Sequence, residues 1–282
     1  MNYWKGEKMI SSNTLFHFTN EVDFLKNILK DNFYPRCCTE DLEFLMPNLK
    51  KDQSKVAIPM VCFCDIPLSK ISNHIDDYGS YGIGLTKEWG IEKGINPIHY
   101  IQKKTLAHNN LINLEKQLVR ILEDMNKIGD YLEFRHKDKN IKLMSDKISA
   151  EIFKSFWEFS GFLKEYRGIN NKNEKEEKIF YDEREWRYIP NVIDSDIDGY
   201  TYRLHGQDCL SQELKNKLNE TLIKYKLKFE AKNVKYLILK NENEITNFME
   251  FIDSLPEDRF NRNEKSILKT KIITVDNIKE DF

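Results

Sequence analysis

Glu183 and Glu185 are the two acidic residues best placed to do chemistry in this sequence. In an extended strand, residues two apart project from the same face, with their Cβ atoms about 7 Å apart. Two partly buried carboxylates at this spacing raise at least one pKa unless a cation, here Arg187, offsets them. The pattern predicts either a surface ladder of charges or a catalytic pair. In a catalytic pair, one carboxylate binds a substrate hydroxyl and the other orients a nucleophile.

His17 and two tyrosines are the other residues that could contact a ligand. His17 stands beside Thr19, and a lone histidine near an apolar strand is either a structural residue or a ligand contact. Tyr78 and Tyr81 stand in a glycine-rich segment, where they could stack on a planar ring or pack within the fold. Together these residues predict one site built from three separated segments, namely the surroundings of His17, Tyr78 to Trp89, and Glu183 to Arg187.

The five cysteines could hold a metal or remain free thiols. One residue separates Cys62 from Cys64, whereas zinc sites use two to four. A metal site would also need His17, His74 or His99 to converge on this pair. Because buried free cysteine is common in strands, we expect reduced thiols and no metal.

The composition limits the classes of partner. Among 282 residues, 44 basic and 46 acidic side chains leave a formal net charge of −2, which gives no global argument for nucleic-acid or membrane binding. The N-terminus is polar, and the longest apolar run, Val56 to Leu68, is too short to span a bilayer. We therefore expect a cytoplasmic protein, and its hydrophobic fraction of 40% suffices for a sizeable core.

Two alternating stretches predict the strands that position the candidate residues. Residues 14–20 alternate, with His17 and Thr19 on one face. Residues 179–190 alternate too, and one face of this strand carries the acidic pair and its cation. A highly charged loop at 171–178 precedes it.

The remaining periodicities complete the fold. They predict helices at 22–29, 101–168 and 245–252, and strands at 56–66, 234–239 and 271–275. A sheet with helices grouped beside it is typical of the α+β class. We expect one domain over residues 1–282, with an antiparallel or mixed sheet in a core at about 10–100 and 178–282, and a helical insert at about 101–170.

The first predicted strand and helix contain two short motifs, Leu15-Phe-His-Phe-Thr19 and Leu25-x-x-Ile28-Leu29. These motifs resemble the opening of NAD-dependent ADP-ribosyltransferase-type folds, which include DarT-like and RNA 2′-phosphotransferase-like enzymes. The resemblance implies NAD as cofactor and an ADP-ribosyltransferase-like sheet. It also implies a role for each candidate residue: ribose contacts for His17 and Thr19, nicotinamide packing for Tyr78 or Tyr81, and a ribose hydroxyl contact for Glu183 or Glu185.

Longer strings are similar to the AbiGi-type family of bacterial abortive phage-infection proteins. They are Pro59-Met-Val-Cys-Phe-Cys-Asp-Ile-Pro-Leu68, Tyr81-Gly-Ile-Gly-Leu-Thr-Lys-Glu-Trp-Gly90, Tyr181-Asp-Glu-Arg-Glu-Trp-Arg187 and Ile272-Ile-Thr-Val-Asp276. The likeness covers most of residues 14–190 and the C-terminal strand. That family is described as the antitoxin half of a two-gene defence system, which implies neutralisation of a partner.

Two functions follow from these resemblances. As an NAD-dependent transferase, the protein would modify a macromolecule, with nucleic acid among the candidate substrates. Glu185 would stabilise the oxocarbenium-like charge, Glu183 would position the acceptor, and Arg187 would hold the carboxylates ionised or bind a phosphate. As a binding module, the protein would restrain a partner toxin or sense a phage component through its surface.

Overall fold

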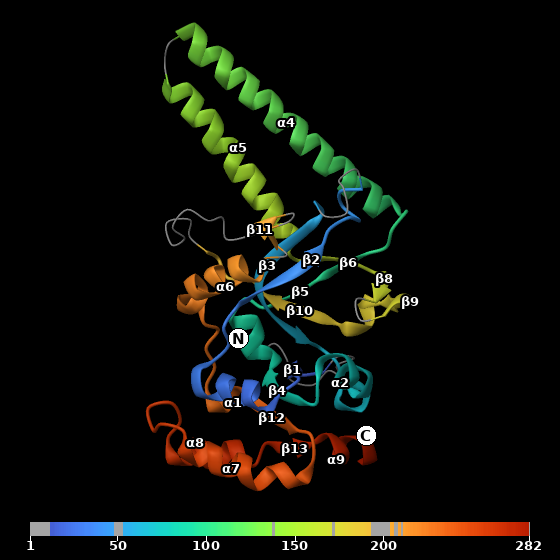
Figure 1. Ribbon diagram of the computed structural model, residues 1–282, viewed down its shortest axis with the longest axis vertical. Coiled ribbons are helices and arrows are strands. Elements are labelled where there is room, and N and C mark those ends of the chain that lie inside the picture. Colours follow the sequence, from blue (N-terminus) through green and yellow to red (C-terminus); the bar gives the residue numbers. More distant parts are fainter. Residues whose placement is uncertain are drawn as a thin grey trace.

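The computed structural model describes residues 12–47, 53–136, 139–170, 173–192, 204–205, 208–209 and 211–281. Its large mixed sheet has helices on both faces (Figure 1). The strand order is β13 (Ile272–Thr274), β12 (Val234–Leu239), β4 (Tyr81–Thr86), β1 (Thr14–Thr19), β3 (Lys55–Cys64), β10 (Glu185–Tyr188) and β5 (Asn96–Pro97). Neighbours in this order are antiparallel except β12 and β13, which are parallel. The expected α+β class with a mixed sheet is confirmed.

The other described strands extend this sheet or form small ones. Strands β2 (Arg36–Asp41) and β11 (Leu204–His205) also pair with β3. The two small sheets are the parallel pair β6 (His99–Ile101) and β7 (Leu163–Glu165), and the antiparallel pair β8 (Arg167–Asn170) and β9 (Asn173–Ile179).

The described helices are α1 (Val22–Asp31), α2 (Ser72–Tyr78), α3 (Lys87–Glu92), α4 (Leu106–His136), α5 (Lys139–Ser160), α6 (Gln212–Thr221), α7 (Ile245–Ser254), α8 (Arg262–Lys269) and α9 (Val275–Asp281). The predicted helices at 22–29 and 245–252 correspond to α1 and α7. In both, the buried residues recur four apart, because that spacing returns to the same face of a helix.

Strand β3 is the longest of the described strands and serves two parts of the fold. Its first six residues pair with β2, and its last four pair with β10. Nearly every residue of β3 is buried, as its continuous apolar run predicts for a central strand. The strand therefore runs from the region where the long helices start to β1 in the middle of the large sheet (Figure 1).

The two faces of the large sheet bury separate hydrophobic clusters. One face carries Leu15 and Phe63 and packs against α1, α3, α7 and α8. The other face carries Phe16 and Cys64 and packs against α2 and α9. Neighbours along a strand point to opposite faces, so each residue of β1 belongs to one of these two environments.

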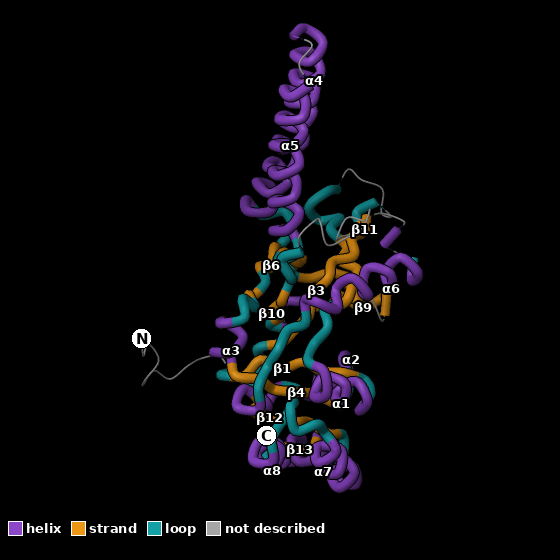
Figure 2. The backbone as a smooth tube through the Cα atoms, turned by 90° about the vertical axis from the view of Figure 1, so that its left-hand side faces the viewer, coloured by secondary structure: helices purple, strands orange, loops and turns teal. Residues whose placement is uncertain are grey.

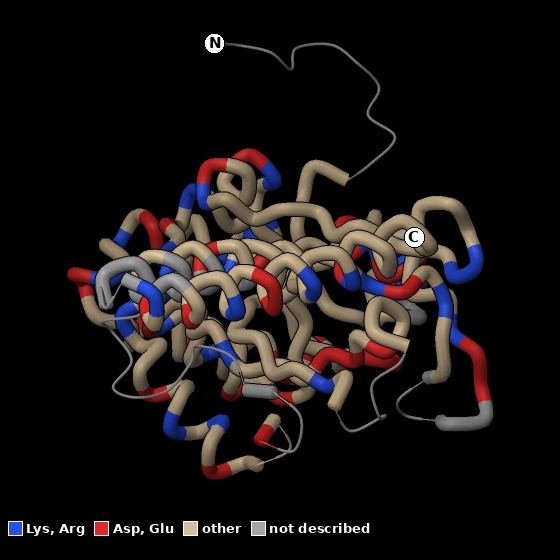
Figure 3. The backbone as a smooth tube through the Cα atoms, turned by 90° about the horizontal axis from the view of Figure 1, so that it is seen from above, with Lys and Arg blue, Asp and Glu red and all other residues tan. Residues whose placement is uncertain are grey.

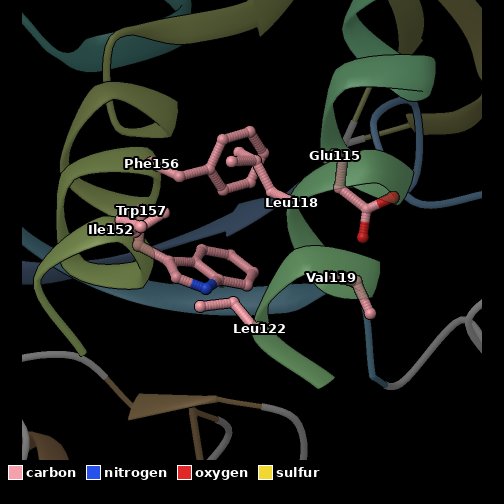
Figure 4. A pocket seen from close by; sticks show the side chains of 7 residues that line it. All are labelled: Glu115, Leu118, Val119, Leu122, Ile152, Phe156 and Trp157. Atoms are coloured by element: carbon pink, nitrogen blue, oxygen red, sulfur yellow. The ribbon is translucent and has the colours of Figure 1, made fainter. Parts of the chain in front are cut away.

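Helices α4 and α5 form a hairpin that projects from one end of the sheet (Figures 1 and 2). Helix α4 has 31 residues, so it is about 46 Å long at the rise of an α-helix. Phe156 and Trp157 of α5 extend toward Leu118 and Leu122 of α4 (Figure 4). Both helices fall inside the interval predicted as a helical insert, but strands β7 (Leu163–Glu165) and β8 (Arg167–Asn170) follow them there.

The predicted strand at 179–190 is wrong in its first half. A 3₁₀ turn, Phe180–Glu183, interrupts it, and Arg184 follows with a φ of 47°, in the left-handed region. Only Glu185–Tyr188 joins the sheet, as β10. The expected loop at 171–178 is also wrong where the structure describes it, because β9 pairs there with β8; residues 171–172 lie outside the described part.

Basic and acidic positions are interleaved over the molecule rather than gathered into regions of one sign (Figure 3). This distribution agrees with the nearly balanced composition. Among the residues that the structure describes, no helix is long and apolar enough to cross a membrane.

Candidate functional site

A partly buried cluster of alternating charges lies on the face of the sheet that carries Cys64. It is called here the charge cluster, and its members are Glu40, Asp77, Lys164, Lys178, Glu183, Glu185 and Arg187. They come from β2, α2, β7, β9, the 3₁₀ turn and β10. Segments far apart in the sequence therefore meet at this cluster.

Arg187 is the centre of the charge cluster and is fully buried. Its Nε donates to Glu185 Oε1 at 2.7 Å, and its Nη2 donates to Glu40 Oε1 at 3.0 Å. Its Nη1 donates to the carbonyl oxygen of Gly161 at 2.8 Å, just after α5 ends. A planar guanidinium can satisfy several fixed acceptors at once, which explains why an arginine occupies this position.

Lys164 bridges the two glutamates that the sequence singled out. Its Nζ lies 2.7 Å from Glu183 Oε2 and 2.9 Å from Glu185 Oε2. The backbone N–H of Glu185 donates to the hydroxyl of Tyr100 at 2.9 Å, which fixes the start of β10. Lys164 therefore joins the two glutamates, although it lies about twenty residues before them in the sequence.

The outer edge of the charge cluster is formed around Glu183. The Tyr78 hydroxyl donates to Glu183 Oε1 at 2.6 Å, and Lys178 Nζ lies 2.9 Å from the same oxygen. Lys178 also pairs with Asp77. The ring of His74 packs against that of Tyr78 in a tilted arrangement, with their centroids 4.6 Å apart. Tyr78 is 39% exposed and links the buried pair to the surface.

Electrostatics keep both glutamates ionised. Burial alone would raise the pKa of Glu185, but the charges of Arg187 and Lys164 outweigh burial and hold that pKa below its ordinary value. The pKa of Glu183 is also lowered, because the charge of Lys164 and the hydrogen bonds from Lys164 and Tyr78 outweigh burial. The pKa of Lys164 is well above its ordinary value, since the neighbouring carboxylates overcome the effect of burial.

This arrangement limits what the two glutamates can do chemically. A general base works best with a pKa near the operating pH, whereas these carboxylates have lowered pKa values. All four of their oxygens are engaged by Tyr78, Lys164, Lys178 or Arg187. The geometry suits a structural junction that holds β7, β9 and β10 together.

His17 lies on the opposite face of the sheet from the charge cluster. Phe16 and Glu185 both pair with Cys64, so these three residues share a face and His17 faces the other way. The His17 ring packs against Phe63, with centroids 5.8 Å apart, and its Nδ1 lies 2.8 Å from the carbonyl oxygen of Cys62. Burial lowers the pKa of His17, so its ring is neutral at pH 7.

Thr19 and Tyr81 share the face of His17, as the predicted alternation of β1 requires. They pair directly across β1 and β4. The Thr19 hydroxyl donates to the carbonyl oxygen of Glu21 at 2.9 Å, and the Tyr81 hydroxyl donates to Glu244 Oε1 at 2.7 Å. The structure thus divides the predicted site into two groups, with Tyr78, Glu183, Glu185 and Arg187 on one face and His17, Thr19 and Tyr81 on the other.

The residues expected to hold NAD do not fit one bound nucleotide. The ribose contact was assigned to His17 and the carboxylate contacts to Glu183 and Glu185, yet the sheet separates them. Among the described residues, no group of three or more His, Cys, Asp or Glu side chains could hold a metal ion. All five cysteines are free.

Sequence reasoning missed Lys164 and Lys178. Lys164 fell within a predicted helical insert and Lys178 within a predicted loop, and neither has a distinctive spacing. The one available signal was charge balance. Two buried carboxylates need more than the single positive charge of Arg187, so at least one further cation had to come from elsewhere in the chain.

Comparison with known proteins identifies the family. The model described as "Putative abortive phage resistance protein AbiGi, antitoxin" matches residues 31–240. The chain belongs to the AbiGi family. The abortive phage resistance protein AbiGi of Lactococcus lactis subsp. cremoris is 29% identical over 262 residues, which cover 89% of this chain and 99% of the relative. No solved structure matches the chain.

The AbiGi match includes the whole charge cluster, since Glu40 and Arg187 both fall inside residues 31–240. It excludes β1, which carries His17, and it also excludes the C-terminal helices. The region matched by the family model therefore includes the charge cluster and the helical hairpin.

Proposed function

We propose that this protein is the antitoxin of an abortive phage-infection system and acts by binding and neutralising a partner toxin. The AbiGi family model carries the word antitoxin in its description and covers most of the chain. The similar lactococcal protein is named for abortive phage resistance. The word antitoxin in the family description favours a binding module over a catalyst.

The saturation of the charge cluster is the observation that carries the non-catalytic part of this proposal. Every carboxylate oxygen of Glu183 and Glu185 already has a partner within the chain. A nucleophile or substrate hydroxyl would have to displace a lysine or arginine from a buried ion pair, at a cost of several kcal/mol. The cluster instead stabilises the scaffold that presents the binding surface.

The test is neutralisation by a folded variant of the cluster. The product of the neighbouring gene is expressed alone, with this protein, and with the Glu183→Gln variant, and growth is recorded together with co-purification. We expect wild type and any folded Glu183→Gln protein to rescue growth and to co-purify with the toxin. Circular dichroism on the purified variant separates loss of fold from loss of activity.

Titration with NAD addresses the transferase alternative. We expect no heat of binding at millimolar NAD for wild type. Binding that weakens in His17→Ala, together with loss of rescue by folded Glu183→Gln, would overturn the proposal in favour of an enzyme. Rescue without co-purification would also contradict direct neutralisation.

A further inference from the structure

A row of apolar side chains lies uncovered along α4. Leu114, Ile121 and Ile128 are 48%, 47% and 57% exposed. They recur every seven residues, which is close to two helical turns, so they form one stripe. An exposed apolar stripe with heptad spacing is the pattern by which one helix binds another.

Helix α5 does not cover this stripe. It packs instead against the neighbouring face of α4, where Leu118 and Leu122 meet Phe156 and Trp157 (Figure 4). At about 100° per residue, Ile121 lies about 80° around α4 from the middle of that contact. Within the hairpin, α5 therefore covers one face of α4, and the adjacent apolar face stays exposed to solvent.

The exposed apolar residues of α5 lie on the same side of the hairpin. Ile148 and Phe159 are 37% and 48% exposed and lie eleven residues apart, about three turns. Around the axis of α5, Ile148 and Phe159 are displaced to one side of the residues that contact α4. Around the axis of α4, Ile121 is displaced in the same rotational sense from the residues that contact α5. In two antiparallel helices, equal senses of rotation point to the same side.

The residues that line the groove between the helices agree with this assignment of sides. Val119 and Trp157 are rotated in the opposite sense, and both line the groove between α4 and α5 (Figure 4). They mark the other side of the hairpin. Five exposed apolar residues of the two helices thus lie on one side of the hairpin, called here the hairpin face: Leu114, Ile121, Ile128, Ile148 and Phe159.

We propose that the hairpin face binds the same face of a second copy of this chain, so that two hairpins form an antiparallel four-helix bundle. The stripe is symmetric about Ile121, because Leu114 and Ile128 lie seven residues to either side. A two-fold axis beside Ile121 pairs Ile121 with itself and Leu114 with Ile128 of the second copy. A two-fold dimer requires such a self-complementary surface.

Charges beside the stripe support a second copy. Arg120 and Asp124 lie on the flank of the stripe away from α5, and both are exposed. They stand one residue before and three residues after Ile121, so the axis brings Asp124 of one copy within about 3 Å, along the helix, of Arg120 of the other. Symmetry repeats the pair, giving two intermolecular contacts between opposite charges.

The first test is the mass of the full-length protein in solution. Light scattering after gel filtration, and sedimentation from 1 to 100 µM loading, should give a dimer of twice 33.7 kDa. Ile121→Glu should give a monomer, because the axis sets the two carboxylates against each other. Val119→Glu, at an exposed position on the other side of the hairpin, is the matched control and should remain a dimer.

A charge exchange tests the symmetry itself. Arg120→Asp should weaken the dimer at least tenfold, since two aspartates then face each other at each contact. Adding Asp124→Arg to that variant should restore the wild-type dissociation constant. Helicity by circular dichroism should be unchanged throughout, because all these side chains are exposed.

Three outcomes would overturn the proposal. They are a wild-type monomer at 100 µM, a dimer that survives Ile121→Glu, and a dimer that Val119→Glu disrupts instead. A wild-type monomer that loses its partner toxin on Ile121→Glu would assign the hairpin face to that toxin. The proposal does not depend on the antitoxin function, because its measurements use the purified chain alone.

Discussion

Glu185 and Arg187 lie two residues apart on β10 and form a buried ion pair on one face of the sheet, with Nε 2.7 Å from Oε1. Arg187 is completely buried and Glu185 nearly so. The sequence suggested Glu183 and Glu185 as a catalytic pair with Arg187 as their cation, and in the structure Arg187 makes a structural contact with Glu185. The contribution of this ion pair to stability depends on two further partners. Lys164 also pairs with Glu185, and Glu40 also pairs with Arg187.

Replacing Glu185 by glutamine should destabilise the protein strongly. The change keeps the shape but removes the charge that pairs with Arg187 and Lys164, and breaking a buried pair costs about 3–5 kcal/mol. Urea denaturation measures the free energy of unfolding. Glu213→Gln removes a surface pair with Lys217 and is the control, with little expected loss because exposed ion pairs are screened by solvent. Equal losses in the two variants would contradict a structural role for Glu185.

The lowered pKa values of Glu183 and Glu185 predict acid sensitivity. A carboxyl with a folded pKa below its unfolded value, 4.5, contributes stability that is present above pH 4.5 and is lost as the pH falls toward the folded pKa. The free energy of unfolding should therefore fall steeply from about pH 5 downward. The Glu185→Gln variant should show a shallower fall, and an unchanged slope would argue against these ionised states.

His74 predicts a separate loss of stability in mild acid. Burial lowers its pKa from 6.5 to about 4. A histidine with a depressed folded pKa contributes stability that is present above pH 6.5 and declines as the pH falls toward 4. Unfolding free energies measured from pH 7 to 4 should fall in wild type and fall less in His74→Phe, which keeps an aromatic ring against Tyr78. A slope of the opposite sign would show that His74 is stabilised in its charged form.

The Tyr78 hydroxyl should contribute modestly to stability. Tyr78→Phe removes a 2.6 Å hydrogen bond to Glu183, while Lys178 keeps the same oxygen paired. We expect a loss of about 1.5 kcal/mol, at the low end of the range for hydrogen bonds to charged groups, because Tyr78 is partly exposed. Tyr131→Phe removes an exposed hydroxyl that accepts from Arg135 and is the control, with little expected change. A loss for Tyr78→Phe as large as that for Glu185→Gln would place Tyr78 in the centre of the network.

Local periodicity predicted the elements whose signals are contained in their own residues. Strand β3 is a continuous apolar run, and α7 places Phe248 and Ile252 on one buried face. The alternation of β1 correctly placed His17 and Thr19 on one face. The break before Glu185 was missed, because a left-handed residue at Arg184 leaves no mark in a pattern of polar and apolar letters.

The site could not be assembled from the sequence because register is a long-range property. Whether His17 and Glu185 share a face depends on how β1, β3 and β10 align, and a shift of one residue reverses every side chain. Lys164 lies on β7, whose place beside the acidic pair depends on its pairing with β6 and on the contact of Gly161 with Arg187. Neither relationship can be read from neighbouring residues.

Gly161 connects the base of the helical hairpin to the charge cluster. Its carbonyl oxygen accepts from Arg187 one residue after α5 ends, and Lys164 follows three residues later. The base of the hairpin is thus anchored to the most deeply buried charge of the protein, while its far end is free of the sheet (Figure 1). A force on the long helices would act through a lever about 46 Å long on contacts that break only at high cost. A partner that binds the hairpin therefore pulls on a base that Arg187 fixes to the sheet.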